Sequence, residues 1–168
     1  MACYEKLKSA GYSRYEISAW SDSASIKNHC KHNINYWSFG DYLGIGAGAH
    51  SKISNSSTQT ITRTVKLRHP KDYIKATKSS HKNNFVLQEN TLSKKDLVFE
   101  FMLNNSRLIN GFNLSLFSET TGLLPKDLTP YLEKAIQQGY LINYNDKIIP
   151  TKQGINFLND LQMIFLEN

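Results

Sequence analysis

The segment from His32 to His50, HNINYWSFGDYLGIGAGAH, constrains this chain more than any other stretch. Gly44, Gly46 and Gly48 alternate there with small apolar residues. In an extended segment this alternation places the glycines on one face, where backbone can approach a ligand closely. The GxGxG spacing is followed by polar SKISNSSTQT rather than by a helix, which argues against a dinucleotide fingerprint. We therefore expect the glycines to form a cofactor-proximal segment.

The first part of the same segment combines histidine with aromatic residues. Tyr36 and Trp37 offer flat apolar surfaces with polar tips, and His32 offers a neutral imidazole nitrogen of the kind that ligates metals and heme iron. A planar, partly anionic ligand would suit this set. A histidine-capped turn beside a buried aromatic cluster remains an alternative, because aromatic side chains usually pack in cores.

The charge is unevenly distributed along the 168 residues, whose formal net charge is +6. Residues 1–90 carry 13 basic and 6 acidic side chains, whereas residues 91–168 carry 7 and 8. A basic surface fits nucleic acid, a propionate-bearing porphyrin or an acidic protein. A merely solvated basic face is the commonest explanation of such a surplus. At 40% hydrophobic residues the chain can form one domain or two small ones.

The sequence contains no targeting or spanning signal and few metal ligands. Its apolar runs are far shorter than the roughly 20 residues that span a bilayer, and its polar start does not fit a signal peptide; we expect a cytoplasmic protein with no integral membrane segment. Cys3 and Cys30 fit neither a disulfide framework nor a zinc or ferredoxin spacing. A metal site at His29, Cys30 and His32 would need a second segment.

The first half of the chain predicts short alternating elements. A helix over residues 2–10 ends at Gly11, and a strand follows at Tyr15–Ser18. This single helix–strand step indicates a cut through an α/β barrel, because a lone strand leaves its edges unpaired. Further along we expect a loop over 51–60, a strand at Thr60–Leu67, a helix from Pro70 to about Lys78, and a linker over 79–85 leading to a boundary near residue 88.

The second half predicts helices and one hairpin. Ser93 and Asp96 approximate a capping box, and the winged-helix-like order that follows ends in a hairpin around Asn145-Asp146. The candidate recognition helix, PYLEKAIQQG, has one lysine and one glutamate, whereas phosphate contact needs a basic face. We therefore expect a packing or lid role and no DNA binding. The expected elements are a helix up to Gly111, helices over 113–122 and 129–139, strands at 140–143 and 147–149, and a last helix from about Thr151.

Three motifs resemble consecutive motifs of the radical-SAM heme chaperone family, whose members are related to oxygen-independent coproporphyrinogen III oxidases. They are YEIS at Tyr15–Ser18, HNINYW at His32–Trp37 and DYLGIGAGAHS at Asp41–Ser51. HNxxYW distinguishes the chaperones from the oxidases. FEFMLNNSRLINGF resembles the family's carboxy-terminal segment, with Glu100, Arg107 and Gly111 in place, whereas Ala19, Trp20 and SDSAS depart from the family's continuation of YEIS.

The resemblance implies an α+β fragment. Residues 1–88 would be the last elements of a partial α/β radical-SAM barrel that carries the HNxxYW and glycine motifs. Residues 89–168 would be a mostly helical, winged-helix-like carboxy-terminal domain. The family's amino-terminal half, with its CxxxCxxC motif, has no counterpart in the sequence.

The resemblance also implies a function. His32 would ligate heme iron, Asn33 would fix the backbone turn, Tyr36 and Trp37 would wall the ring, and Lys31 or Arg14 would meet a propionate. The parent would transfer heme to an acceptor hemoprotein and use S-adenosylmethionine and a 4Fe-4S cluster. That cluster needs three thiolates and this chain has two, so we expect it to be inactive alone, with no catalytic residue. Part of a coproporphyrinogen III oxidase of porphyrin biosynthesis and a non-catalytic nucleic-acid-binding module are the alternatives.

Overall fold

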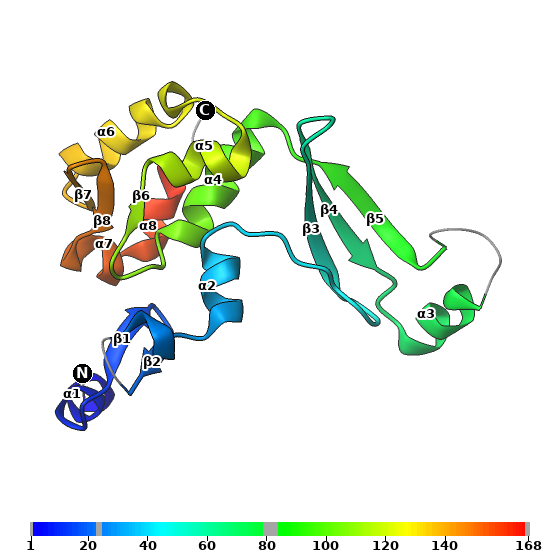
Figure 1. Cartoon of the computed structure of the whole chain (residues 1–168), viewed down its shortest axis with the longest axis horizontal. Coiled ribbons are helices and arrows are strands. Elements are labelled where there is room, and N and C mark those ends of the chain that lie inside the picture. The colour runs from blue at the N-terminus through cyan, green and yellow to red at the C-terminus, as the bar shows by residue number, and fades with distance from the viewer. Residues whose placement is uncertain (1, 23–24, 79–83, 167–168) are drawn as a thin grey trace. The chain divides into compact units, whose positions relative to one another are not determined.

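The computed structural model describes residues 2–22, 25–78 and 84–166. The chain divides into two compact units (Figure 1), of which unit 1 comprises Met1–Gly40 with Leu97–Asn168 and unit 2 comprises Asp41–Asp96. Both units combine helices with antiparallel sheets, in agreement with the expected α+β class. The expected boundary near residue 88 falls inside a strand of unit 2, and the expected linker over 79–85 lies mostly outside the described residues.

Unit 1 begins with a helix and a small hairpin. The helix α1 (Ala2–Ser9) is confirmed, and Gly11 follows it with φ +85°, a conformation that glycine adopts without steric cost. The strand β1 (Ser13–Glu16) starts and ends two residues earlier than expected, and it pairs antiparallel with β2 (Ala19–Ser21). Among the described strands of unit 1 no pair is parallel. In the described residues the chain reverses directly after β1, and β1 pairs with β2. The assignment of β1 to an α/β barrel therefore stays a prediction.

The turn of this hairpin is held by Arg14. Its guanidinium donates to the carbonyl oxygens of Glu16, at 3.2 Å, and of Ile17, at 3.0 Å. After the hairpin, unit 1 continues with the 3-10 turn η1 (Ile26–Asn28) and the helix α2 (Lys31–Trp37).

The rest of unit 1 is built around buried phenylalanines. Phe101 is 0% exposed and meets Phe39, Phe112 and Phe117 edge to face, with ring centroids 5.1 to 6.0 Å apart; such pairs stabilise beyond their buried area. The elements are α4 (Lys94–Asn105), β6 (Phe112–Asn113), α5 (Ser115–Thr121), η2 (Pro125–Asp127), α6 (Thr129–Gln137), β7 (Leu141–Tyr144), β8 (Lys147–Pro150), α7 (Lys152–Asn156) and α8 (Leu158–Met163).

The carboxy-terminal elements follow most of the sequence signals. The helix expected up to Gly111 is shorter than predicted, because α4 ends at Asn105, and the 3-10 turn η2 was not expected. The hairpin β7–β8 is confirmed, and Asn145 and Asp146 at its turn have positive φ of 50° and 63°, as two-residue hairpin turns require. The two-residue strand β6, which pairs with β8, was not expected, since two residues show no periodicity. The expected last helix is split at Phe157, whose ψ of 48° is not helical.

Unit 2 is a three-stranded antiparallel sheet with one helix. The sheet order is β3 (His50–Asn55), β4 (Thr60–Lys66), β5 (Val86–Thr91), and α3 (Pro70–Thr77) follows β4. The predictions of β4 and α3 are confirmed. The prediction of a loop over 51–60 is wrong for its first half, because β3 buries polar Ser51 and Lys52, each 1% exposed, instead of apolar side chains. In the edge strand β5 five of six residues are exposed, so it lacks a hydrophobic pattern.

In the described parts of the chain, helices are too short or too polar to cross a lipid bilayer.

Candidate functional site

The HNINYW motif forms the helix α2, Lys31–Trp37, rather than a turn (Figure 1). Because a helix advances about 100° per residue, Asn33 and Trp37 share one face, and His32 and Tyr36 share the adjacent face. The helix contains no buried residue, and Cys30 at its N-cap makes no side-chain hydrogen bond. The motif therefore presents two different faces, and contacts with the rest of unit 1 determine which face packs against the protein.

Asn33 attaches one end of this helix to β1. Its side-chain amide donates to the hydroxyl of Tyr15 at 3.2 Å, and the Tyr15 ring, 5% exposed, is stacked on the His29 ring at 4.4 Å. Asn33 thus bonds a distant side chain instead of fixing its own backbone turn, and this part of the sequence interpretation is corrected. His29 serves as packing for Tyr15, and among the described residues no group of three His, Cys, Asp or Glu side chains could hold a metal ion.

Trp37 lies between an arginine and a tyrosine. The Arg107 guanidinium lies over its ring, 4.2 Å from the centroid, and Tyr36 meets it edge-on with centroids 4.9 Å apart. The indole N–H is buried, with no hydrogen-bond partner in the described residues. The Arg107 cation therefore covers one face of the Trp37 ring, which was expected to wall the heme. A cation over an aromatic ring contributes about 0.5–2 kcal/mol to stability.

Arg107 also neutralises a buried acid of the YEIS motif. Its Nη2 donates to Glu16 at 3.2 Å and to the Ser18 hydroxyl at 2.9 Å, and the side chains of Arg107 and Glu16 are 22% and 2% exposed. The two segments also share backbone bonds, from Ile17 N–H to the Arg107 carbonyl at 3.1 Å and from Ile109 N–H to the Tyr15 carbonyl at 3.2 Å. The turn after β1 and the segment after α4 therefore form one connected support under α2.

His32 itself is exposed on α2, and no described residue engages its imidazole in a hydrogen bond or ion pair. An accessible imidazole of this kind can present a neutral nitrogen to iron. Lys31, its neighbour, is also exposed. Arg14, the other predicted propionate partner, instead donates hydrogen bonds to carbonyl oxygens in the turn after β1.

The glycine segment belongs to unit 2, and it is not extended. Gly46 and Gly48 have positive φ of 109° and 71°, so the predicted alternation of faces is wrong. A Cβ on Gly44 would lie 2.0 Å from the His50 carbonyl oxygen, so backbone packing accounts for that glycine. Nothing lies within 4 Å of a Cβ at Gly46, and the neighbouring Ile45 is 82% exposed. The cofactor-proximal role of the three glycines stays a prediction.

Asp41, at the start of unit 2, holds the buried Lys52. The Lys52 ammonium donates to Asp41 Oδ1 at 2.9 Å, and Ser54 donates to the same carboxylate from its backbone N–H, at 2.7 Å, and its hydroxyl, at 2.9 Å. Partial burial raises the pKa of Asp41, but these hydrogen bonds and the Lys52 charge outweigh it, so the pKa lies below its ordinary value. Unit 2 carries 10 basic and 4 acidic residues, so the chain's basic surplus lies in residues 41–96.

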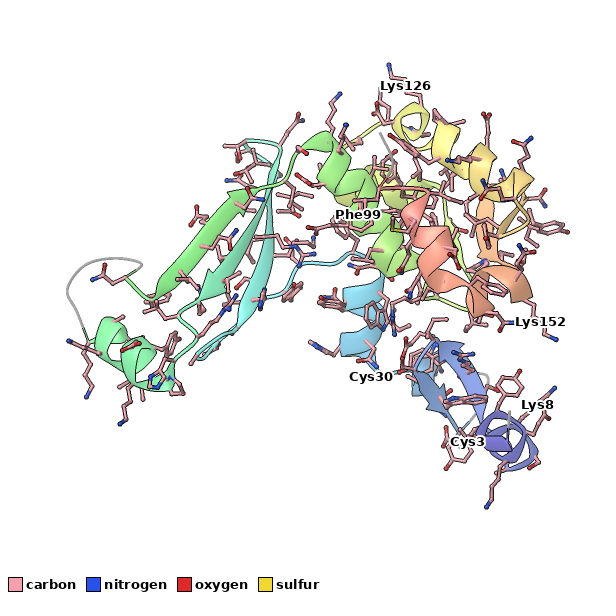
Figure 2. The ribbon with its side chains drawn as sticks, turned by 180° about the vertical axis from the view of Figure 1, so that it is seen from behind. Cys3, Lys8, Cys30, Phe99, Lys126 and Lys152 are labelled. Carbon is pink, nitrogen blue, oxygen red and sulfur yellow. The ribbon has the colours of Figure 1, made fainter. Side chains whose placement is uncertain are left out.

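The two cysteines lie on different elements of unit 1. Figure 2 labels Cys3, on α1, and Cys30, which directly precedes α2. Both are free thiols and exposed.

The support formed by Glu16 and Arg107 was missed at the level of sequence. Both residues stood within quoted motifs, but 91 positions separate them along the chain. A single sequence carries no signal that pairs charges at such a distance. The sequence indicated only that each residue belongs to a motif, and it did not indicate that the two residues contact each other.

Comparison with known proteins gives consistent matches. Residues 92–157 match the HemN C-terminal domain family. Heme chaperone HemW of Buchnera aphidicola from Acyrthosiphon pisum is 41% identical over 161 residues, 96% of this chain and 40% of the relative. Heme chaperone HemW of Escherichia coli is 37% identical over 163 residues, 97% of this chain and 40% of the relative.

A solved structure shows the same fold. Coproporphyrinogen III oxidase (HemN) of Escherichia coli, described as a radical SAM enzyme, matches 98% of this chain and 39% of its own with a TM-score of 0.64 and 14% identity. The chain spans about two fifths of the length of these relatives. The comparisons confirm the resemblance found in the motifs: this chain is similar, over nearly all of its length, to the carboxy-terminal portion of HemW-type radical-SAM heme chaperones.

Proposed function

We propose that this chain supplies the carboxy-terminal part of a heme chaperone, and that His32 is the axial ligand of the heme it carries. The observation that carries the proposal is the placement of His32, exposed on α2 while the adjacent face of the helix is attached to Tyr15 and Arg107. A ligand histidine needs an accessible nitrogen on a backbone that does not move. The relatives that are named heme chaperones supply the identity of the cargo.

The residues around His32 fit a porphyrin. Tyr36 follows one helical turn later on the same face and is half-buried, so it offers a flat surface beside the imidazole. The exposed Lys31 ammonium is available for a propionate. Asn33 and Trp37 contribute from the adjacent face, by holding the helix and by supporting the Tyr36 ring.

The other cofactors of the family do not fit this chain. A radical-SAM cluster takes three cysteine thiolates and leaves its fourth iron for S-adenosylmethionine, whereas this sequence has two cysteines. The glycine segment at Gly44, Gly46 and Gly48 remains proposed as a part of the family's cofactor-proximal region. Transfer of heme to an acceptor hemoprotein is proposed for the parent protein.

We also keep the two-part division at residue 88 as a proposal for the family's domains. The order α4, β6, α5, α6, β7, β8 supports a winged helix in the second part. Its candidate recognition helix α6 carries only Glu133 and Lys134 as charged residues, which gives no footprint for phosphates. A packing or lid role fits better than DNA binding. Assignment of residues 1–88 to the end of a partial barrel is likewise a proposal.

Heme titration of single variants tests the role of His32. His32→Ala should remove the Soret shift that marks histidine ligation and weaken binding by at least roughly tenfold, since an iron–nitrogen bond is lost. Tyr36→Phe should largely keep the Soret shift and the affinity for heme, because the aromatic ring remains. His29→Ala and His50→Ala are the controls. A spectrum that changes only in one of these controls would move the site to that histidine.

A coproporphyrinogen III oxidase fragment is the competing reading, and it rests on the fold shared with HemN. The chaperone relatives are 37–41% identical and the oxidase is 14% identical. Retention of heme without turnover of coproporphyrinogen III by the parent protein distinguishes the two.

A further inference from the structure

Arg107 contacts the helix that carries His32 without belonging to any of the motifs assigned to heme. We propose that Arg107 is a positioning residue for His32: by stacking on Trp37 while it is anchored to Glu16, it fixes the orientation of the His32 and Tyr36 face of α2. This inference rests on the proposed function of His32, and it adds a residue that acts on the ligand from the segment after α4.

The helix α2 needs such external support. It has seven residues, no buried residue and no side-chain N-cap bond, and a helix this short is not stable in water by itself. Asn33 holds its first turn, by the bond to Tyr15. Its last turn therefore depends on what contacts Trp37 and on how the helix ends.

The backbone conformation that ends α2 is energetically unfavourable without tertiary contacts. Phe39 follows the helix with φ +60°, a left-handed conformation that is unfavourable for any residue with a Cβ. Gly40 N–H bonds the Asn35 carbonyl at 2.8 Å and Phe39 N–H bonds the Tyr36 carbonyl at 3.2 Å, which is a Schellman termination. Phe39, 1% exposed, packs against Phe101. The strained termination persists only while surrounding contacts hold it.

The guanidinium of Arg107 is suited to hold the last turn. Its Nη2 reaches Glu16 and Ser18, and its Cζ lies over the Trp37 ring, 4.2 Å from the centroid. Arginine can make both contacts at once because its charge is delocalised over a rigid plane. Lysine can neutralise Glu16 but has no plane to stack, so Arg107→Lys separates the two roles.

The effect reaches His32 through adjacent rings. Tyr36 meets the Trp37 ring edge-on at 4.9 Å, and Tyr36 lies one turn after His32 on the same face. A Trp37 ring that is free to rotate would therefore release the Tyr36 ring and the last turn together. The imidazole would then lose its fixed orientation toward the iron.

A double-mutant cycle on heme binding by this chain tests the inference, with the four proteins wild type, Arg107→Lys, His32→Ala and the double variant. Arg107→Lys alone should weaken heme binding roughly 10- to 100-fold, the usual cost of losing the partner that orients a metal ligand, and should reduce the histidine-ligated Soret shift. In the His32→Ala background it should change nothing further, because its effect passes through His32. Arg68→Lys, at an exposed position of unit 2, is the matched control.

Two further measurements show that the variant is folded and that the contact is broken. The thermal midpoint of Arg107→Lys should stay close to that of wild type. In a Trp20→Phe background, which leaves Trp37 as the single tryptophan, its emission should shift when the cation leaves the ring. If Arg107→Lys does not fold, the pair Glu16→Gln with Arg107→Met removes both charges of the ion pair and takes its place in the cycle.

The outcomes are distinct. If Arg107→Lys weakens heme binding by the same factor in the wild-type and His32→Ala backgrounds, the positioning role is overturned and a structural role remains. If His32→Ala weakens heme binding and Arg107→Lys does not, the inference about Arg107 is overturned and the proposed function of His32 remains intact. Unchanged binding on His32→Ala would overturn both.

Discussion

The ammonium of Lys52 lies 2.9 Å from Oδ1 of Asp41, and only 2% of the Lys52 side chain is exposed. A charge buried to this extent is tolerated only when it is paired. Ser54 donates two further hydrogen bonds to the same carboxylate. Asp41 therefore joins the segment before β3 to β3 itself.

Replacing this acid should loosen the sheet of unit 2. Asp41→Asn keeps the shape of the side chain but removes the negative charge beside Lys52, so we expect unit 2 to lose about 1–3 kcal/mol of stability. Hydrogen exchange of the β3 and β4 amides measures this loss. Asp72→Asn is the matched control, since Asp72 and its partner His69 are 70% and 63% exposed and 4.0 Å apart. An equal loss of protection in both variants would contradict the prediction.

The same pair predicts a pH dependence. The pKa of Asp41 is lower in the folded protein than its ordinary value of about 3.9. A group of this kind contributes stability that is fully present above the unfolded pKa and is lost as the pH falls through the folded pKa. The difference in protection between wild type and Asp41→Asn should therefore be constant at neutral pH, decrease below about pH 4, and vanish in stronger acid. A difference that grows on acidification would show that another group is responsible.

Two glycines of unit 1 allow the energetic cost of a positive φ to be measured separately from the cost of a steric clash. Gly111 and Gly122 have similar positive φ, 66° and 72°. A Cβ would meet the Ile148 carbonyl oxygen at 1.9 Å at the first position and nothing within 4 Å at the second. Gly122→Ala should cost about 1–2 kcal/mol, from conformation alone, and Gly111→Ala clearly more, because β6 and β8 must separate. Urea unfolding followed by circular dichroism compares them, and equal midpoints would refute the packing argument.

Local signals predicted much of the fold. Ser93 and Asp96 form the expected capping box, with Ser93 Oγ at 2.6 Å from Asp96 Oδ2, and the hairpin turn at Asn145-Asp146 lies where its residue types indicated. Both structures depend on residues that are adjacent in sequence. Strand β3 was not predicted, because the side chains it buries are Ser51 and Lys52, and their burial depends on Asp41 and Gly44.

The candidate site was predictable only as a set of residue types. The motif and its helix period give the common face of His32 and Tyr36 once a helix is known to form. The contacts that hold α2 come from Tyr15 and Arg107, which lie far away in sequence. A single sequence cannot show such pairings, and so the support under the motif became visible only in the structure.

The last prediction concerns the iron–sulfur cluster of the family. We expect that this chain alone neither assembles a 4Fe-4S cluster nor cleaves S-adenosylmethionine. Three thiolates are needed to leave one iron open for the cofactor, and this sequence supplies Cys3 and Cys30 only, one on α1 and one before α2. Anaerobic reconstitution with iron and sulfide should therefore give no stable visible absorbance, and no 5′-deoxyadenosine should form from S-adenosylmethionine. Cys3→Ser and Cys30→Ser should behave as the wild type does. A four-iron spectrum that either substitution abolishes would show that the cysteine count misleads and that the missing ligand comes from another side chain or a second copy of the chain.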